Sequence, residues 1–129
     1  MPLINLGMSF NEAKQEGERQ KLKLTEGPYK LVCKVAKTTE SKKKTPQIEW
    51  LFEVVENTNP DFNGKELRKW TPLPHDGKVG GIGYLVEITE ALGVPWDGRG
   101  FDLDACVGKI CNANIELNDD GFNNIKSFI

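Results

Sequence analysis

The amino-acid sequence predicts a mainly β protein whose five strands close into a barrel, with one helix between strands three and four. Alternating apolar and polar residues recur in five short stretches, which is the period of a β-strand. Clusters of Gly, Pro, Asn and Asp separate these stretches, as turns do. One stretch, from Ile82 to Leu92, has helical spacing instead. The 129 residues suffice for a single hydrophobic core.

Two parts are expected along the chain: residues 1–24 as an N-terminal arm, and residues 25–129 as the folded domain. The stretch NEAKQEGERQK is almost entirely polar, lacks an apolar period and has a glycine in its middle. Such a stretch buries little apolar surface. We therefore expect the arm to be extended or partly ordered, and pinned by Leu3, Leu6 and Phe10.

The first strand is expected in EGPYKLVCKVAK, where one face is apolar and the other carries lysines. The inward face would hold Tyr29, Leu31, Cys33 and Val35, and the outward face Lys30, Val32, Lys34 and Ala36. The loop TTESKKKTP follows, and Pro46 then introduces the second strand. Its inward residues are expected to be Ile48, Trp50, Phe52 and Val54, alternating with Gln47, Glu49, Leu51 and Glu53.

The third strand is expected in KELRKWTPL, after the turn-rich ENTNPDFNG. With Leu67 inward, Arg68 and Trp70 fall on the opposite face. The period then becomes helical, and the apolar helix positions are Ile82, Leu85, Val86, Thr89 and Leu92. Gly93 would end the helix as a left-handed C-cap.

The last two strands are expected in KICNANIEL and FNNIKSF, joined by the turn NDDG. A short turn capped by Asp102 precedes them, in FDLDACVG. The resulting order of strands and helix is that of the OB-fold. The face of that barrel around strands two and three, with its flanking loops, binds oligonucleotides and oligosaccharides.

The sequence contains no convincing active site. His75, the single histidine, lies in a Pro-rich turn with no Ser or Cys beside it. Cys106 and Cys111 are separated by four residues and Cys33 is distant, which fits no usual zinc site. The glycine-rich GKVGGIG lacks the pattern of a nucleotide-binding loop. We expect no catalysis, no metal and no cofactor.

The composition favours a protein that stays in the cytoplasm. No stretch approaches the roughly 18 apolar residues of a membrane helix, and the N-terminus lacks the pattern of a signal peptide. Three cysteines cannot all pair with one another, so reduced thiols in an intracellular setting are expected.

The formal net charge is −2, but the charges are segregated. Residues 1–44 contain ten Lys and Arg against five Asp and Glu, whereas residues 45–129 contain seven against fourteen. A local basic patch can bind phosphates even on an acidic molecule. The run from Lys42 to Lys44 is either a solvated loop tip or part of a polyanion site. Its position on the loop between strands one and two, which rims the OB-fold groove, favours the second interpretation.

The tryptophans are expected to have different roles. Trp50 would lie in the core and Trp96 would plug one end of the barrel. Trp70, beside Arg68 on the outer face, is the best candidate for stacking on a base. Glu49 and Glu53 would repel a polyanion from strand two, which shifts the expected groove toward strand three and the loops. The predicted nucleic-acid-binding residues are Lys30, Lys34, Lys37, Lys42, Lys43, Lys44, Arg68, Lys69 and Trp70.

Several motifs resemble a phage-encoded family of OB-fold single-stranded DNA-binding proteins, long carried as a domain of unknown function. The similar stretches are EGPYKLVCKVAKTTESKKKTPQIEWLFEVV, FNGKELRKWTPL, the helix end ALGVP, and DLDACVGK. The resemblance covers about residues 25–129. It implies non-enzymatic binding of single-stranded DNA in phage DNA replication or recombination, in the host cytoplasm and beside phage or host proteins of those processes.

Two readings from other classes stay open at this point. An OB-fold module that binds a partner protein and no nucleic acid would show little salt dependence. A small hydrolase or nuclease would need clustered carboxylates and a metal ion.

Overall fold

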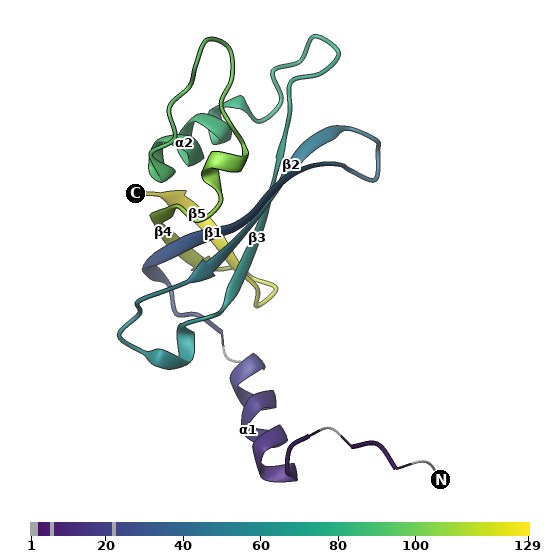
Figure 1. Ribbon diagram of the computed structural model, residues 1–129, viewed down its shortest axis with the longest axis vertical. Helices are drawn as coiled ribbons and strands as arrows, with labels where there is room; N and C mark the ends of the chain where they lie inside the picture. Colours follow the sequence, from purple (N-terminus) through teal and green to yellow (C-terminus); the bar gives the residue numbers. More distant parts are fainter. Residues whose placement is uncertain (1–2, 6, 22) are drawn as a thin grey trace.

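The computed structural model describes residues 3–5, 7–21 and 23–129, without the side chains of residues 16–21 (Figure 1). Its helices and strands are α1 (Phe10–Lys21), β1 (Gly27–Glu40), β2 (Pro46–Val54), β3 (Glu66–Pro72), α2 (Ile82–Leu92), β4 (Ile110–Leu117) and β5 (Asn123–Phe128). Short 3-10 turns, η1 (Pro60–Phe62) and η2 (Asp104–Cys106), precede β3 and β4. From β1 onward, the predicted order of strands and helix is confirmed.

The five strands form one antiparallel sheet in the order β3-β2-β1-β4-β5. The outer strands of this order, β3 and β5, contact each other, so the sheet curls into a nearly closed barrel. The fold is therefore an OB-fold-like five-stranded barrel, as predicted. Figure 1 shows α2 at one end of this barrel and α1 beyond the other end.

The central strand β1 pairs with β4 along residues 27–32 and with β2 along residues 31–40. The register shifts between Cys33 and Val35, where one extra residue forms a bulge. At this bend the Cys33 N–H donates to the Lys109 carbonyl (2.9 Å), and the Gly108 N–H donates to the Cys33 carbonyl (2.7 Å). One long, bent strand thereby pairs with β4 in its first part and with β2 in its second part.

The bulge makes part of the expected face assignment wrong. Val35, predicted inward, lies opposite Leu51 on the outer face, whereas Ala36, predicted outward, lies opposite Trp50 and is buried. An inserted residue reverses the inside and outside positions of everything that follows it. The strand also continues to Glu40, three residues further than expected, so the connecting loop is shorter.

The core residues of β2 and β3 are confirmed. Trp50 and Phe52 are fully buried and stack, with ring centroids 6.1 Å apart. The Trp50 indole N–H donates to the Thr71 hydroxyl at 3.0 Å, which satisfies two polar groups inside the barrel. Leu67 is buried, and Trp70 is 51% exposed on the other face of β3.

Helix α2 covers the end of the barrel with a slightly different face from the predicted one. Its buried residues are Leu85, Ile88, Thr89 and Leu92, whereas Val86 is 40% exposed. Gly93 ends the helix at φ 73°, the predicted left-handed cap. The Trp96 indole N–H donates to the Thr89 hydroxyl (2.9 Å), and its ring packs on Phe101, so Trp96 covers this end while staying partly exposed.

Within the arm, which was expected to be extended or partly ordered, residues 10–21 form the helix α1 and are not extended. The Ser9 hydroxyl accepts from the Glu12 N–H at 3.2 Å and caps the first turn. Good helix formers follow, so the helix needs no apolar face to begin. Leu3 and Phe10, expected to pin the arm, are 97% and 80% exposed, and Leu6 lies outside the described residues. None of the helices in the described ranges is long and apolar enough to span a bilayer.

The three cysteines are free and buried. Burial raises the pKa of Cys33 and of Cys111 to about 12, and that of Cys106 to about 11. The thiols are therefore protonated in the folded protein over the whole neutral range, as inert packing groups are.

The buried thiols should make the protein lose stability at alkaline pH. Below pH 9 each thiol is protonated in both the folded and the unfolded state. Above it the unfolded chain loses these protons first, so each thiol lowers the free energy of unfolding by about 1.4 kcal/mol per pH unit. Urea titrations between pH 8 and 10.5 measure this slope. Cys111→Ala should reduce the slope, and an unchanged slope would contradict the assignment.

Replacing Trp50 by alanine should lower the free energy of unfolding by about 3–5 kcal/mol, because it opens a cavity and leaves the Thr71 hydroxyl without its donor. Trp70→Ala is the matched control and should change stability by no more than about 0.5 kcal/mol. Urea denaturation of the two variants gives both values. Equal losses would mean that the two rings are not on opposite faces.

Candidate nucleic-acid interface

The β1–β2 hairpin extends away from the barrel and ends in a tight turn, Ser41–Thr45 (Figure 1). The Ser41 N–H donates to the Thr45 carbonyl (2.9 Å), and the Lys44 N–H donates to the Ser41 carbonyl (2.8 Å). The Ser41 hydroxyl also accepts from the Thr45 N–H at 3.1 Å. These bonds hold the turn in one conformation at the end of a long two-stranded ribbon.

Lys42, Lys43 and Lys44 occupy this turn and are all exposed. Among the described residues, no ion pair joins their ammonium groups to an acidic side chain. Glu40 lies nearby at the end of β1, but three adjacent cations that form no ion pair among the described residues repel one another and favour a bound anion. We refer to these three residues as the lysine tip.

Lys44 adopts a left-handed backbone conformation, with φ at 61°. A residue with a Cβ pays roughly 1–2 kcal/mol for that conformation, and glycine or asparagine is its usual occupant. Lysine at this position has an unfavourable backbone conformation but adds a third charge to the tip.

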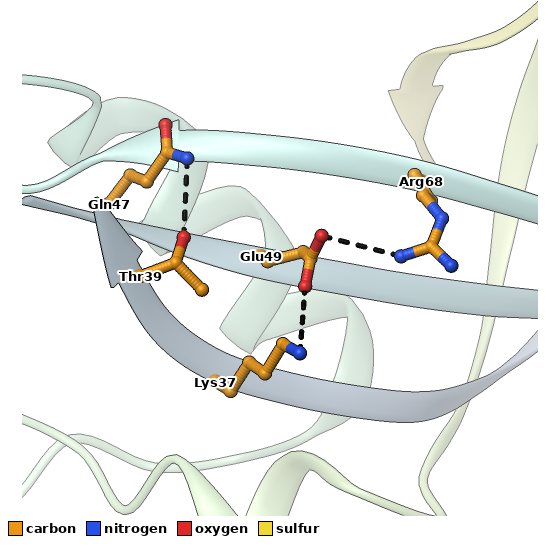
Figure 2. A network of polar contacts seen from close by, with 5 residues as sticks. All are labelled: Lys37, Thr39, Gln47, Glu49 and Arg68. Atoms are coloured by element: carbon orange, nitrogen blue, oxygen red, sulfur yellow. Dashed lines mark hydrogen bonds and ion pairs between the residues drawn. The ribbon is translucent and has the colours of Figure 1, made fainter. Parts of the chain in front are cut away.

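The outer face of β1, β2 and β3 carries a network of polar side chains (Figure 2). Glu49 accepts from Lys37 Nζ at 3.3 Å and from an Arg68 guanidinium nitrogen at 3.3 Å. Beside it, Gln47 donates to the Thr39 hydroxyl at 3.2 Å. Two cations share one carboxylate, so this cluster keeps a surplus positive charge next to the hairpin.

Trp70 lies on the same outer face, directly opposite Glu49 in the β2–β3 ladder. Leu51, which lies opposite Arg68 on this outer face, is buried. From Glu49 to the turn residue Thr45 is four strand positions, or about 13 Å. The exposed Trp70 ring and the lysine tip are therefore within reach of one short polymer.

Two of the predicted residues, Lys30 and Lys34, do not join this group. Lys30 is ion-paired with Glu56, and Lys34 lies 3.6 Å from Glu53 and 3.8 Å from Glu66. Along β1, Lys30 is about 30 Å from the end of the strand at Glu40. Acidic side chains neutralise this end of the face, which periodicity alone could not reveal.

Lys69 is also separated from its predicted partners. It follows Arg68 on the strand, so its side chain leaves β3 on the opposite side and lies over the Tyr84 ring at 4.8 Å. A similar pair, Lys23 over Phe122 at 5.1 Å, lies next to the β4–β5 turn and was missed by the sequence analysis. The loops that flank the OB-fold groove include this turn, so Phe122 could have been considered from its position alone.

The residues that the sequence analysis considered for catalysis or metal binding do not form such a site among the described residues. His75 Nδ1 lies 2.8 Å from the Leu73 carbonyl oxygen, which fixes the ring within its own turn. Within the described residues, no three His, Cys, Asp or Glu side chains converge as a metal site requires.

Lys44→Gly should raise the free energy of unfolding by up to about 1 kcal/mol, because glycine adopts the left-handed conformation without a Cβ clash. Lys43→Gly is the matched control. Lys43 is not among the described residues with positive φ. Glycine there should only increase the conformational entropy of the unfolded chain, which lowers the free energy of unfolding. Thermal melts of both variants check the sign. Stabilisation by neither would contradict the strain at Lys44.

No known protein-family profile matches this chain, and no curated protein sequence matches it.

Proposed function

We propose that this protein binds single-stranded DNA without turnover, through the lysine tip and the exposed face of β2 and β3. The observation that carries the proposal is the position of Lys42, Lys43 and Lys44. These three lysines, without ion-pair partners among the described residues, occupy the hydrogen-bonded turn of the β1–β2 hairpin, and the exposed Trp70 lies opposite β2 about 13 Å from that turn. Ammonium groups neutralise phosphates and release counterions, while an exposed ring stacks on a base of any sequence.

The fold supports the proposal, since the OB-fold-like barrel exposes this same face and loop to oligonucleotides in many proteins. Arg68 lies two positions from Trp70 on β3, and Lys37 lies two strands away across Glu49, so a phosphate next to a stacked base would find a cation. The DNA would have to compete with Glu49 for both cations. Lys37 and Arg68 are each more than half exposed, so solvent and salt screen their ion pairs with Glu49 and reduce the cost of this competition.

The resemblance to the phage family extends the proposal to phage DNA replication or recombination. The alternative, a module that binds a partner protein and no nucleic acid, is favoured by one observation: acidic side chains neutralise Lys30 and Lys34 on the lower half of the same face. The two proposals differ in salt dependence, because only phosphate binding releases condensed counterions.

Replacing Lys42, Lys43 and Lys44 together by alanine should weaken binding to oligothymidylate and reduce the slope of log K against log salt by about 2. The slope falls because three phosphate contacts are lost. Fluorescence anisotropy with a labelled oligonucleotide, at several salt concentrations, measures both quantities.

The matched control replaces three other exposed lysines, Lys14, Lys109 and Lys126, and changes the net charge by the same amount. It should leave the affinity near that of the unaltered protein. If both triple variants bind equally well, the lysine tip is only a solvated turn. If the unaltered protein shows no salt-dependent binding of single strands, the proposed function is wrong.

A further inference from the structure

A second cluster of basic and aromatic side chains lies at the other end of β3. A pocket there lies between the start of β3, the start of β5 and the segment that leads into β1. The polar and aromatic residues that line it are Lys23, Lys65, Glu66, Arg68, Phe122 and Asn123. Three of these residues are cations and one is acidic, so the pocket has a basic excess.

Two reciprocal hydrogen bonds hold the pocket together. The Leu24 N–H donates to the Asn123 side-chain oxygen at 2.8 Å, and the Asn123 side-chain nitrogen donates to the Leu24 carbonyl at 2.9 Å. Leu24 is itself buried. The adjacent residues, Lys23 and Phe122, are thereby fixed next to each other, although they lie nearly a hundred positions apart in the sequence.

Phe122 offers the kind of surface on which a base stacks. Its ring is 61% exposed, and the Lys23 ammonium lies 5.1 Å from the ring centroid. The turn behind it is ordered, because the Asn118 side-chain oxygen accepts from the Phe122 N–H (2.9 Å) and from the Asp120 N–H (3.1 Å). A ring on a backbone that is held in this way loses less conformational entropy on binding than a ring on a mobile loop.

Arg68 connects this pocket to the face that carries Trp70. Its guanidinium reaches Glu49 on the outer face, and Arg68 also lines the pocket. Trp70 is two positions further along β3, on the same side of the strand. A polymer that leaves Trp70 past Arg68 therefore arrives at Lys23, Lys65 and Phe122.

We propose that Lys23, Lys65 and Phe122 form a second nucleotide subsite, in which a base stacks on Phe122 and the flanking phosphates contact the two lysines. This inference rests on the proposed function and adds a direction: the bound strand runs along β3 from the lysine tip, past Trp70 and Arg68, to the β4–β5 turn. The exposed carboxylates of Asp119 and Asp120 repel phosphates from the turn itself, which leaves the lysine side of the ring as the phosphate path.

The test compares Phe122→Ala with Tyr84→Ala as its matched control. Both rings are more than half exposed and both have a lysine ammonium about 5 Å from the centroid, but Tyr84 contacts Lys69 on the side of β3 opposite to Trp70 and Arg68. Anisotropy titrations use oligothymidylates of about 16 and about 4 nucleotides, the range of sites on one OB-fold. Melting temperatures verify that the variants are folded.

Phe122→Ala should lower affinity for the longer oligonucleotide about tenfold, the loss of one stacked base. It should affect the shorter one less, because a short strand can bind at the lysine tip and Trp70 alone. Tyr84→Ala should match the unaltered protein with both. Lys23→Gln should reduce the salt slope with the longer oligonucleotide by about 1.

Different results would overturn the two proposals separately. If Phe122→Ala binds the longer strand as tightly as Tyr84→Ala does, while Trp70→Ala and the lysine-tip variant are weakened, the second subsite is rejected and the proposed function stands. If the unaltered protein binds neither oligonucleotide in a salt-dependent way, the proposed function fails and the subsite fails with it.

Discussion

The bulge in β1 is the constraint on which the rest of this structure depends. A regular strand of 14 residues could not pair with β4 at one end and β2 at the other while the sheet closes on itself. The extra residue near Cys33 bends β1, and the carbonyl and N–H of Cys33 bond to the segment before β4. The second half of β1 is then free to leave the barrel with β2 as a hairpin. The lysine tip is exposed because of this bend.

The distribution of charge along the outer face follows from which carboxylates the strands bring opposite the lysines. Toward the barrel's lower end, Glu53, Glu56 and Glu66 neutralise the cations of β1. Toward the hairpin, the single carboxylate of Glu49 is ion-paired with both Lys37 and Arg68. The lysines of the turn form no ion pair among the described residues. Lysines and arginines without a carboxylate of their own therefore gather toward the hairpin, although the chain as a whole is acidic.

Local pattern predicted most of the fold, because its strands and its helix obey simple periods. The faces of β2 and β3 were correct, including the opposite positions of Trp50 and Trp70. The bulge could not be predicted, since no residue type is specific for it. The inward and outward positions of Val35 and Ala36 were therefore predicted the wrong way round. For α1 the search for an apolar period overlooked the capping residue Ser9. Of the candidate site, the lysine run was found from composition, whereas the pairing of Lys30 and Lys34 with glutamates depends on cross-strand register.

The hydrogen bonds between Leu24 and Asn123 have a consequence for how the chain folds. They join positions separated by 99 residues, among the longest-range contacts that a chain of this length can make. Closing so long a loop costs conformational entropy, and the contacts within local turns do not offset this cost. Long-range contacts of this kind therefore form late in folding. During synthesis, Lys23 emerges long before Phe122, and the pocket between them is complete only once β5 has been made. The β1–β2 hairpin, by contrast, is local and can form while most of the barrel is still absent.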